Sequence, residues 1–337
     1  MTFAMVLIEY LAGFIDGEGY LALGRIPRRG STEYPVRMVV YNTNLEVIEA
    51  IRSVWGGTVS CSKSRKPGWK DQYALIWTNA AAANLLEKVA PYLRIKAQQA
   101  ATLLDFQSHI RAGRRSRDSR GRLLPMSSEE QNSREAVYQY LKRLNARGPQ
   151  AEFEPKTPSG PRFANASANG CPSSEYLAGF IDGEGSLMIN RVKARDSPRV
   201  QYRARIAIGN TNRAVLEDIQ ASYGGILVKE YRAEAGWKHL HQLVWTGGML
   251  EQLLDAVGPY LRIKREQTTV MRAFLRHMKN TPRARQGPRA RFFAPLPEDV
   301  VAYRESLCVR MKELNARGVP IKSSASIKGS DRWYAPL

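Results

Sequence analysis

The sequence predicts an α+β protein made of two similar halves, each with its own antiparallel sheet of four strands. Two observations lead to this prediction. A ten-residue segment at residues 10–19 returns without change at residues 176–185. In addition, helical and extended patterns of apolar residues follow one another in the same order in both halves. Each half has about 150 residues, which is the size of a domain and too long for a solenoid unit.

Shorter matches extend this repeat over the whole of each half. They are Asn-Thr-Asn at 42–44 and 210–212, Pro-Tyr-Leu-Arg-Ile-Lys at 91–96 and 259–264, and Leu-Asn-Ala-Arg-Gly at 144–148 and 314–318. The offset between the copies grows only from 166 to 170 residues. Such a small drift indicates a fused duplication of one ancestral domain.

The repeat and the composition divide the chain into four parts. An N-terminal domain covers 1–148, and a C-terminal domain covers 175–318. Between them, residues 149–174 are rich in Pro, Ser, Gly, Asn and Ala, a composition typical of a linker. Residues 319–337 form a tail.

Apolar spacing predicts the elements of the first half, and the second half repeats them. Leu7, Leu11, Phe14 and Ile15 lie close to a helical stripe, which Gly17 and Gly19 are expected to end. We expect, in chain order, a helix over 7–16, strands over 20–26 and 36–41, a helix over 44–55, strands over 58–61 and 72–77, and helices over 80–89, 95–110 and 129–145.

The charge of the chain indicates a polyanionic ligand. Lys and Arg number 51 against 31 Asp and Glu, which gives a net charge of +20, and the pI is near 10.0. An excess of this size is typical of proteins that bind nucleic acid. Two loops rich in arginine, 111–132 and 280–297, are predicted to contact phosphate, although solvated charge is the alternative.

Other classes of protein are excluded by the composition. No run of about 18 apolar residues could span a membrane, and the first residues have no signal-peptide pattern. Cys61, Cys171 and Cys308 are odd in number and far apart, so neither a disulfide scaffold nor a cysteine zinc site is expected. We expect an intracellular, reducing compartment, either the cytoplasm and nucleoid or an organelle matrix.

The repeated segment has the chemistry of a helix interface that ends in an acid. Gly13 and Gly17 are four residues apart, as are Gly179 and Gly183, and such spacing opens a groove for another backbone. The second copy of the helix is the natural partner, which predicts a pseudo-twofold axis. Glu18 and Glu184 would then emerge beside this axis as ligands for a hard cation, although helix capping or ion pairing is the alternative.

The two copies of Leu-Ala-Gly-Phe-Ile-Asp-Gly-Glu-Gly resemble the motif that names the LAGLIDADG homing endonucleases, and two copies in one chain resemble the single-chain branch of that family. The resemblance implies two pseudo-symmetric αββαββα domains packed through their motif helices, with antiparallel sheets forming a DNA-binding saddle. It also implies a monomeric enzyme of mobile introns that needs no protein partner or membrane. Its activity would be a double-strand break in a long, partly asymmetric DNA target.

The resemblance also implies the roles of individual residues. Glu18 and Glu184 would bind Mg²⁺, with the backbone of Gly17 and Gly183 as further ligands. Asp16 and Asp182 would be structural and would orient the ends of the helices. The remaining catalytic candidates are Lys96 and Lys264, which would lie near the scissile phosphate, and Asn42 and Asn210, which would orient water.

DNA recognition is expected from one face of the strands, because side chains alternate between the two faces. Arg reads guanine and Gln reads adenine in the major groove, while many contacts go to phosphate. The candidates are Arg25, Arg28, Arg37, Lys63, Arg65, Lys70, Gln72, Arg191, Lys193, Arg199, Arg203, Arg205, Lys229, Arg232, Lys238, His239 and His241.

Three alternative functions use the same residues differently. An RNA-binding intron maturase, alone or combined with the nuclease, would have this fold and charge, but loss of one carboxylate would be its mark, and both are present. A DNA-binding regulator would carry an added helix-turn-helix domain, for which the sequence leaves no segment. An intein would need a nucleophile at residue 1 and a terminal Asn, where the chain has Met1 and Leu337.

Overall fold

The computed structural model describes residues 6–28, 31–113, 119–120, 126–146, 170–193, 200–230, 239–281, 285–286 and 292–316. The predicted linker core, the tail and part of each basic loop therefore lie outside the described residues. None of the helices in these ranges is long and apolar enough to cross a membrane.

The first half has the predicted order of elements. They are α1 (Ile8–Glu18), β1 (Gly19–Leu23), β2 (Ile26–Arg28), β3 (Ser31–Glu33), β4 (Val36–Asn42), α2 (Leu45–Trp55), β5 (Thr58–Ser62), β6 (Gln72–Thr78), α3 (Asn79–Val89), the 3-10 turn η1 (Ala90–Tyr92), α4 (Ala97–Ala112) and α5 (Ser128–Leu144).

The second half repeats the main helices and strands in this order, but its described residues contain no counterpart of β2 and β3, and a short strand pair precedes its last helix. Its elements are α6 (Ser174–Glu184), β7 (Gly185–Lys193), β8 (Val200–Asn210), α7 (Arg213–Tyr223), β9 (Ile226–Glu230), β10 (Leu240–Thr246), α8 (Gly248–Val257), α9 (Arg265–Asn280), β11 (Arg285–Gln286), β12 (Phe292–Phe293) and α10 (Glu298–Leu314).

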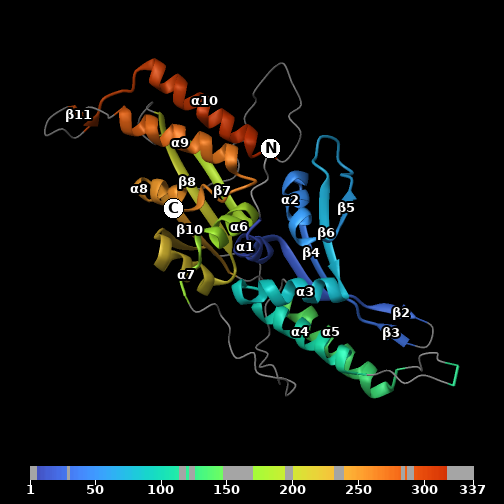
Figure 1. Ribbon diagram of the computed structural model, residues 1–337. Helices are drawn as coiled ribbons and strands as arrows, with labels where there is room; N and C mark the ends of the chain where they lie inside the picture. The colour runs from blue at the N-terminus through green and yellow to red at the C-terminus, as the bar shows by residue number, and fades with distance from the viewer. Residues whose placement is uncertain are drawn as a thin grey trace.

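Each half contains one four-stranded antiparallel sheet, as the sequence predicted. The strand orders are β1-β4-β6-β5 and β7-β8-β10-β9, so the two topologies are the same. In Figure 1 the helices α1 and α6 lie side by side between the two sheets, with the first half in blue to green and the second in yellow to red. The motif helices thus form the contact between two pseudo-symmetric halves.

The following differences from the predicted boundaries have a structural cause. The first helix continues through Gly17 to Glu18, because Gly17 faces the partner helix closely, and Gly19 is the glycine that caps its end. The strand predicted over 20–26 ends at Leu23, and β2 and β3 form a separate short hairpin. The helix predicted from residue 95 begins at Ala97, since the carboxylate of Asp16 binds the backbone of residues 94–96 in a non-helical form.

One face of each sheet is covered by helices and forms the core. Trp77 and Trp245 are almost fully buried there. Their indole Nε1 atoms donate hydrogen bonds to the carbonyls of Trp55 and Tyr223, at 3.0 and 2.9 Å, where α2 and α7 end. Gly57 follows with a φ of 99°, and a Cβ atom at this position would lie 2.9 Å from the Trp77 ring. The opposite face of each sheet is not part of this core.

Candidate functional site

The crossing of α1 and α6 depends on two glycines at its centre. A Cβ atom on Gly13 would lie 1.9 Å from the carbonyl oxygen of Tyr176, and one on Gly179 would lie 2.0 Å from that of Tyr10. No side chain fits at these distances without moving the backbone. The predicted groove for close approach of the two motif helices is therefore confirmed.

The same crossing brings the two motif glutamates together. A Cβ atom on Gly17 would lie 3.3 Å from Cγ of Glu184, and one on Gly183 would lie 3.3 Å from Cγ of Glu18. Each glutamate is the last residue of its helix and precedes the first strand of its sheet. Two carboxylates from opposite halves thus lie beside one pseudo-twofold axis.

The electrostatics of this carboxylate pair differ from those of surface acids. Burial, reinforced by the charge of Glu184, raises the pKa of Glu18 from 4.5 to about 7, although Lys264 and Lys96 act in the opposite direction. Burial also raises the pKa of Glu184, again against Lys96 and Lys264. Burial therefore disfavours the charged form of both carboxylates, and the two lysines offset only part of this effect.

Lys96 and Lys264 reach the same site from the segments before α4 and α9. Burial lowers the pKa of both ammonium groups, while the two glutamates and the nearby aspartates raise it. The Nζ of Lys264 donates a hydrogen bond of 2.6 Å to the carbonyl of Asp182, and Lys96 bonds the carbonyl of Asp16 in the same way. Each lysine is thereby held at the end of the motif helix in its own half.

The motif aspartates position these lysines. The carboxylate of Asp16 accepts hydrogen bonds from the backbone N–H groups of Arg94, Ile95 and Lys96, at 2.7, 3.1 and 2.9 Å. Asp182 binds residues 262–264 in the same way. The predicted structural role is thus found, but the aspartates orient the lysine segments and not the ends of the helices.

Two tyrosines of the repeated segment, which the sequence analysis did not single out, tie the halves together. The hydroxyl of Tyr10 donates to the Asp182 carboxylate, and that of Tyr176 donates to the Asp16 carboxylate, both at 2.7 Å. Both tyrosines are buried. Each lysine segment is therefore held by an aspartate of its own half and, through that aspartate, by a tyrosine of the other half. The identity of both copies at these positions was the available signal.

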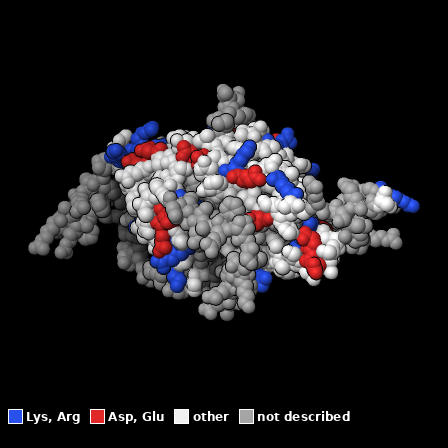
Figure 2. All heavy atoms as spheres, turned by 60° about the horizontal axis from the view of Figure 1, so that its bottom comes forward, with Lys and Arg blue, Asp and Glu red and all other residues white. Residues whose placement is uncertain are grey.

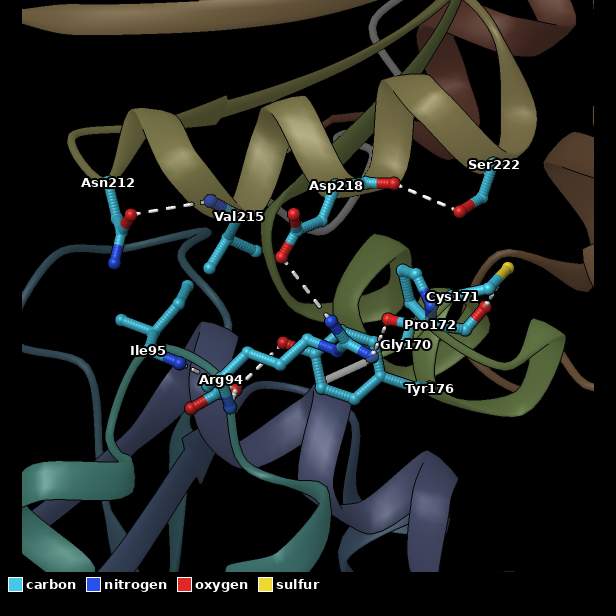
Figure 3. A network of polar contacts seen from close by, with 11 residues as sticks. Arg94, Ile95, Gly170, Cys171, Pro172, Tyr176, Asn212, Val215, Asp218 and Ser222 are labelled. Carbon is cyan, nitrogen blue, oxygen red and sulfur yellow. Dashed lines mark hydrogen bonds and ion pairs between the residues drawn. The ribbon is translucent and has the colours of Figure 1, made fainter. Parts of the chain in front are cut away.

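Arg94 lies over the ring of Tyr176, as Arg262 lies over that of Tyr10 at 5.3 Å, but its ion pair with Asp218 occurs on one side only (Figure 3). Its guanidinium lies 5.5 Å from the centre of the Tyr176 ring and donates to the carbonyl of Gly170 at 2.8 Å. It also pairs with Asp218 of α7 at 3.4 Å. The first half has Ala50 at the position that corresponds to Asp218, so this ion pair has no symmetric copy.

Asn42 and Asn210 have a structural use that competes with the predicted catalytic one. The Oδ1 atom of each accepts a hydrogen bond of 2.8 Å from the backbone N–H two residues later, at Asn44 and Asn212. Asn44 in turn caps α2, where its side chain accepts from the N–H of Val47 at 3.1 Å. These contacts explain the repeated Asn-Thr-Asn as a turn between strand and helix. A role in orienting water stays a prediction.

The register of the strands places some candidates on the face of the sheet opposite the helices, here called the open face. In the first half these are Arg37, which is exposed, and Gln72 at the start of β6. In the second half they are Arg203 and Arg205 of β8. Gln242, which no sequence pattern singled out, lies beside Arg205 on this face, and its Oε1 accepts a hydrogen bond of 3.1 Å from Nη2 of the arginine.

Arg25 and Arg191 point to the helical side, which differs from our expectation. Arg25 pairs with Glu135 of α5 at 3.1 Å, and Arg191 pairs with Glu305 of α10 at 3.4 Å. Tyr34 and Tyr202 donate to the same two carboxylates. This Arg–Glu–Tyr arrangement occurs in both halves and fastens the last helix of each half to its sheet, so it accounts for both arginines without DNA.

His241 and Lys229 also fall on the helical side of their sheet. The two residues are paired across β10 and β9, on the same face of the sheet as the core residue Leu243. His241 is only 8% exposed. Burial lowers its pKa, and the charges of Arg213, Lys229 and His239 lower it further. The expectation that His239 and His241 share a DNA-facing surface is therefore wrong for His241, because the register is one residue out of phase.

The remaining candidates lie at the ends of hairpins or outside the described residues. Arg28 belongs to the β2–β3 hairpin and pairs with Glu33 at 3.2 Å. Lys63, Arg65 and Lys70 are exposed in the connection between β5 and β6. The candidates that lie outside the described residues are Arg199, Arg232, Lys238 and the side chain of Lys193.

The described part of the first basic loop offers little free charge. Arg111 bonds Glu87 at 3.4 Å and Asn84 at 3.2 Å. On the face shown in Figure 2, acidic and basic side chains of the described residues are interspersed, and they form no uniform positive surface there. Phosphate contact by the loop stays a prediction.

The carboxylate pair fits a divalent cation that completes its coordination with substrate. Among the described residues, no cluster of three or more His, Cys, Asp or Glu side chains could hold a metal. Mg²⁺ is commonly held by one or two carboxylates together with substrate phosphates. Glu18 and Glu184 provide this donor set, because the crossing of the motif helices brings one carboxylate from each half together.

Comparisons with known proteins agree with this geometry. Residues 177–240 match the family model described as LAGLIDADG endonuclease. The meganuclease I-SmaMI, bound to an uncleaved DNA target in the presence of calcium ions, is 15% identical with a TM-score of 0.59, covering 91% of this chain and 99% of that one. For I-AabMI bound to uncleaved DNA, the identity is 15%, the TM-score 0.60 and the coverage 90% and 98%. No curated protein sequence matches the chain.

Two sheets that meet through paired motif helices, with one glutamate from each helix, define the two-repeat LAGLIDADG fold. Residues 177–240, which include the second motif, match the LAGLIDADG endonuclease family, and the solved meganucleases I-SmaMI and I-AabMI share the fold of the chain. The resemblance stated from the sequence is thereby confirmed.

Proposed function

We propose that the chain is a homing endonuclease that makes a double-strand break at one long, partly asymmetric DNA site. The observation that carries the proposal is the meeting of Glu18 and Glu184 at the crossing of α1 and α6, with Lys96 and Lys264 beside them. The net charge of +20 suits a polyanionic substrate. The similar structure I-SmaMI is described as bound to cleaved DNA in one case and to uncleaved DNA in another, which supports the same substrate here.

The residues of the site divide the chemistry between them. Glu18 and Glu184, with the backbone of Gly17 and Gly183, would hold Mg²⁺, which lowers the pKa of bound water and neutralises charge on the phosphate. Lys96 and Lys264 are held at the ends of the motif helices and would stabilise negative charge that develops on the phosphate oxygens. The pseudo-twofold axis relates these groups, so one set serves each DNA strand.

Recognition is assigned to the open faces of the two sheets. Arg37 and Gln72 in the first half, and Arg203 and Arg205 in the second, are positioned there by the register. Because the halves differ at most open-face positions, the two parts of the target differ in sequence. A single chain supplies both halves, so the proposal is a monomeric enzyme.

The test begins with selection of bound duplexes from a randomised DNA library in Ca²⁺, followed by a cleavage assay in Mg²⁺. Ca²⁺ accepts looser geometry, so we expect it to support binding with little cutting. Glu18→Gln and Glu184→Gln should each abolish double-strand cleavage and leave DNA binding in place. Glu46→Gln, at an exposed acid in the first turn of α2, is the matched control and should cut normally.

Two results would contradict the proposal. Cleavage at the wild-type rate by either motif variant would remove the glutamates from the site. Binding to structured RNA, with no duplex selected from the DNA library, would favour a maturase instead.

A further inference from the structure

The two open faces carry an arginine at the same position of the repeat, in different surroundings. Arg37 lies opposite Thr78, and Arg205 lies opposite Thr246. Both arginines are in the second strand of their sheet, 168 residues apart. The pair therefore allows one side chain to be compared in two environments within the same chain.

Arg205 is held in place by a neighbour. Its Nη2 atom donates to Oε1 of Gln242 on β10 at 3.1 Å. Gln242 lies opposite Gly209, where a Cβ atom would come within 4.0 Å of the Gln242 Cγ. Gly209 has no side chain, so none stands beside the glutamine at this position. The Nε–H of Arg205 is buried and has no acceptor in the described part of the chain, so the guanidinium retains donor capacity that the protein does not use.

Arg37 has no such neighbour, because the large and the small residue on the adjacent strands stand at exchanged positions. Tyr41 occupies the position of Gly209, and Ala74 occupies the position of Gln242. Arg37 is exposed, and within the described residues no side chain accepts a hydrogen bond from it. Its guanidinium keeps its rotational freedom, whereas that of Arg205 has already lost part of it.

We propose that Arg205 and Gln242 form a preorganised reader of one guanine, a role that rests on the proposed DNA-cleaving function and deepens it. Guanine presents two acceptors, O6 and N7, in the major groove, and an arginine fork donates to both. Oε1 of Gln242 is turned toward Arg205, so its amide NH₂ group adds donors beside the guanidinium. A surface on which donors predominate favours guanine over adenine, which presents a donor of its own at N6.

The register also fixes where this guanine lies. Arg205 is opposite Met188, the fourth residue after Glu184. At about 3.3 Å per residue, this is about 13 Å along the strand from the cleavage site. For a strand that follows the DNA groove, in which base pairs rise by about 3.4 Å, this distance corresponds to about four pairs outward from the phosphate served by Glu184. Arg37 faces the mirrored position and discriminates bases less there.

The experiment compares position-by-position base preferences of full-length variants, selected on a randomised duplex library in Ca²⁺. The wild type should require guanine at one position of one half-site, with other bases disfavoured by about tenfold or more. Gln242→Ala should reduce this preference to about threefold or less at that position alone. Gln72→Ala is the matched control, because it removes an open-face glutamine from the first half and should leave this position unchanged.

A gain of preference tests the same idea in the other half. Tyr41→Gly combined with Ala74→Gln copies the surroundings of Arg205 around Arg37. This double variant should acquire a guanine preference of about tenfold at the mirrored position. Urea unfolding of each variant checks that the fold is intact, and Arg205→Ala identifies the position that Arg205 reads.

The possible failures can be told apart. If the wild type selects no duplex, the proposed function fails and this inference fails with it. If the wild type selects a target but Gln242→Ala leaves every position unchanged, or weakens all positions equally, the guanine reader is overturned while the endonuclease proposal stands. Loss of preference at the single predicted position, with gain at the mirrored one in the double variant, supports it.

Discussion

The two halves of this protein are nearly identical where they touch each other and different where they face outward. At the interface, Gly13 and Gly179 meet opposite carbonyls, and Tyr10 and Tyr176 bind opposite aspartates, with matching distances. On the open faces, Arg205 has a glutamine beside it and Arg37 has none. The two copies of the duplicated domain thus keep the same sequence where they pack against each other. Their sequences diverge where each copy faces a different environment.

The largest expected effect is a loss of stability when the symmetric crossing of α1 and α6 is disrupted. Gly13→Leu and Gly179→Leu should each destabilise the whole chain by about 3 kcal/mol or more, because a Cβ atom there meets a backbone carbonyl that cannot move freely. The two losses should be equal and should appear in one urea transition. Gly248→Ala is the control, since nothing lies within 4 Å of the added Cβ atom. An unchanged transition in either Leu variant would count against the helix interface.

The next effect concerns the pH dependence of the metal-free protein. The pKa of Glu18 is about 7 in the folded chain, against 4.5 in an unfolded one, so its contribution to stability is complete below pH 4.5 and is lost as the pH rises through 7. We expect the free energy of unfolding to fall by about 2 kcal/mol over this window, relative to Glu18→Gln. Urea unfolding at a series of pH values, with a chelator present, measures this change in the free energy of unfolding. If this free energy depended on pH in the same way for both proteins, the raised pKa of Glu18 would be refuted.

The lysines offer a smaller effect on catalysis. Lys96→Met and Lys264→Met should each slow cleavage by more than about tenfold, or about 1.4 kcal/mol of barrier. Affinity should fall only as for one lost phosphate contact, with the salt slope reduced by about one. Single-turnover cleavage at saturating DNA, beside binding across salt, separates the two. Because the lysines occupy equivalent positions, unequal effects would show that the two strands are cut by different means.

The smallest effect tests the asymmetric tie. Asp218→Ala removes the partner of Arg94, but the Asp218 side chain is 56% exposed, so the loss should be under about 1 kcal/mol and should vanish in high salt. Asp255→Ala, which breaks the Arg272 pair within the second half, is the control. A loss well above 1 kcal/mol would mean that this single ion pair, and not the symmetric helix crossing, sets the position of the halves.

The sequence predicted most of the fold because periodic patterns are local. The order of elements, both sheets and the helix interface follow from apolar spacing and from glycines four residues apart. The details that failed depend on contacts between distant residues. Arg25 and Arg191 were expected to face DNA, but Glu135 and Glu305 lie more than a hundred residues away along the chain and hold them on the helical side. His241 was misplaced because an error of one residue in register reverses the face.

The sequence likewise predicted some residues of the candidate site and not others. Glu18 and Glu184 were found because a repeated acid after a glycine pair is visible in the sequence. The links from Tyr10 to Asp182 and from Tyr176 to Asp16 were not, since the spacing within one copy does not reveal a hydrogen bond to the other. The same holds for the pairing of Arg205 with Gln242, which lie on adjacent strands.

The crossing of α1 and α6 is built from two copies of the same ten residues, so each helix is complementary to itself. The surface that α6 presents to α1 is also the surface that it would present to another α6. The second half carries its own Gly179, Tyr176 and Asp182, which are all the groups that these contacts require. Produced without the first half, it has the means to form a twofold homodimer with two copies of the Arg205 face. The covalent tandem thus contains, in each half, the interface of a symmetric ancestor.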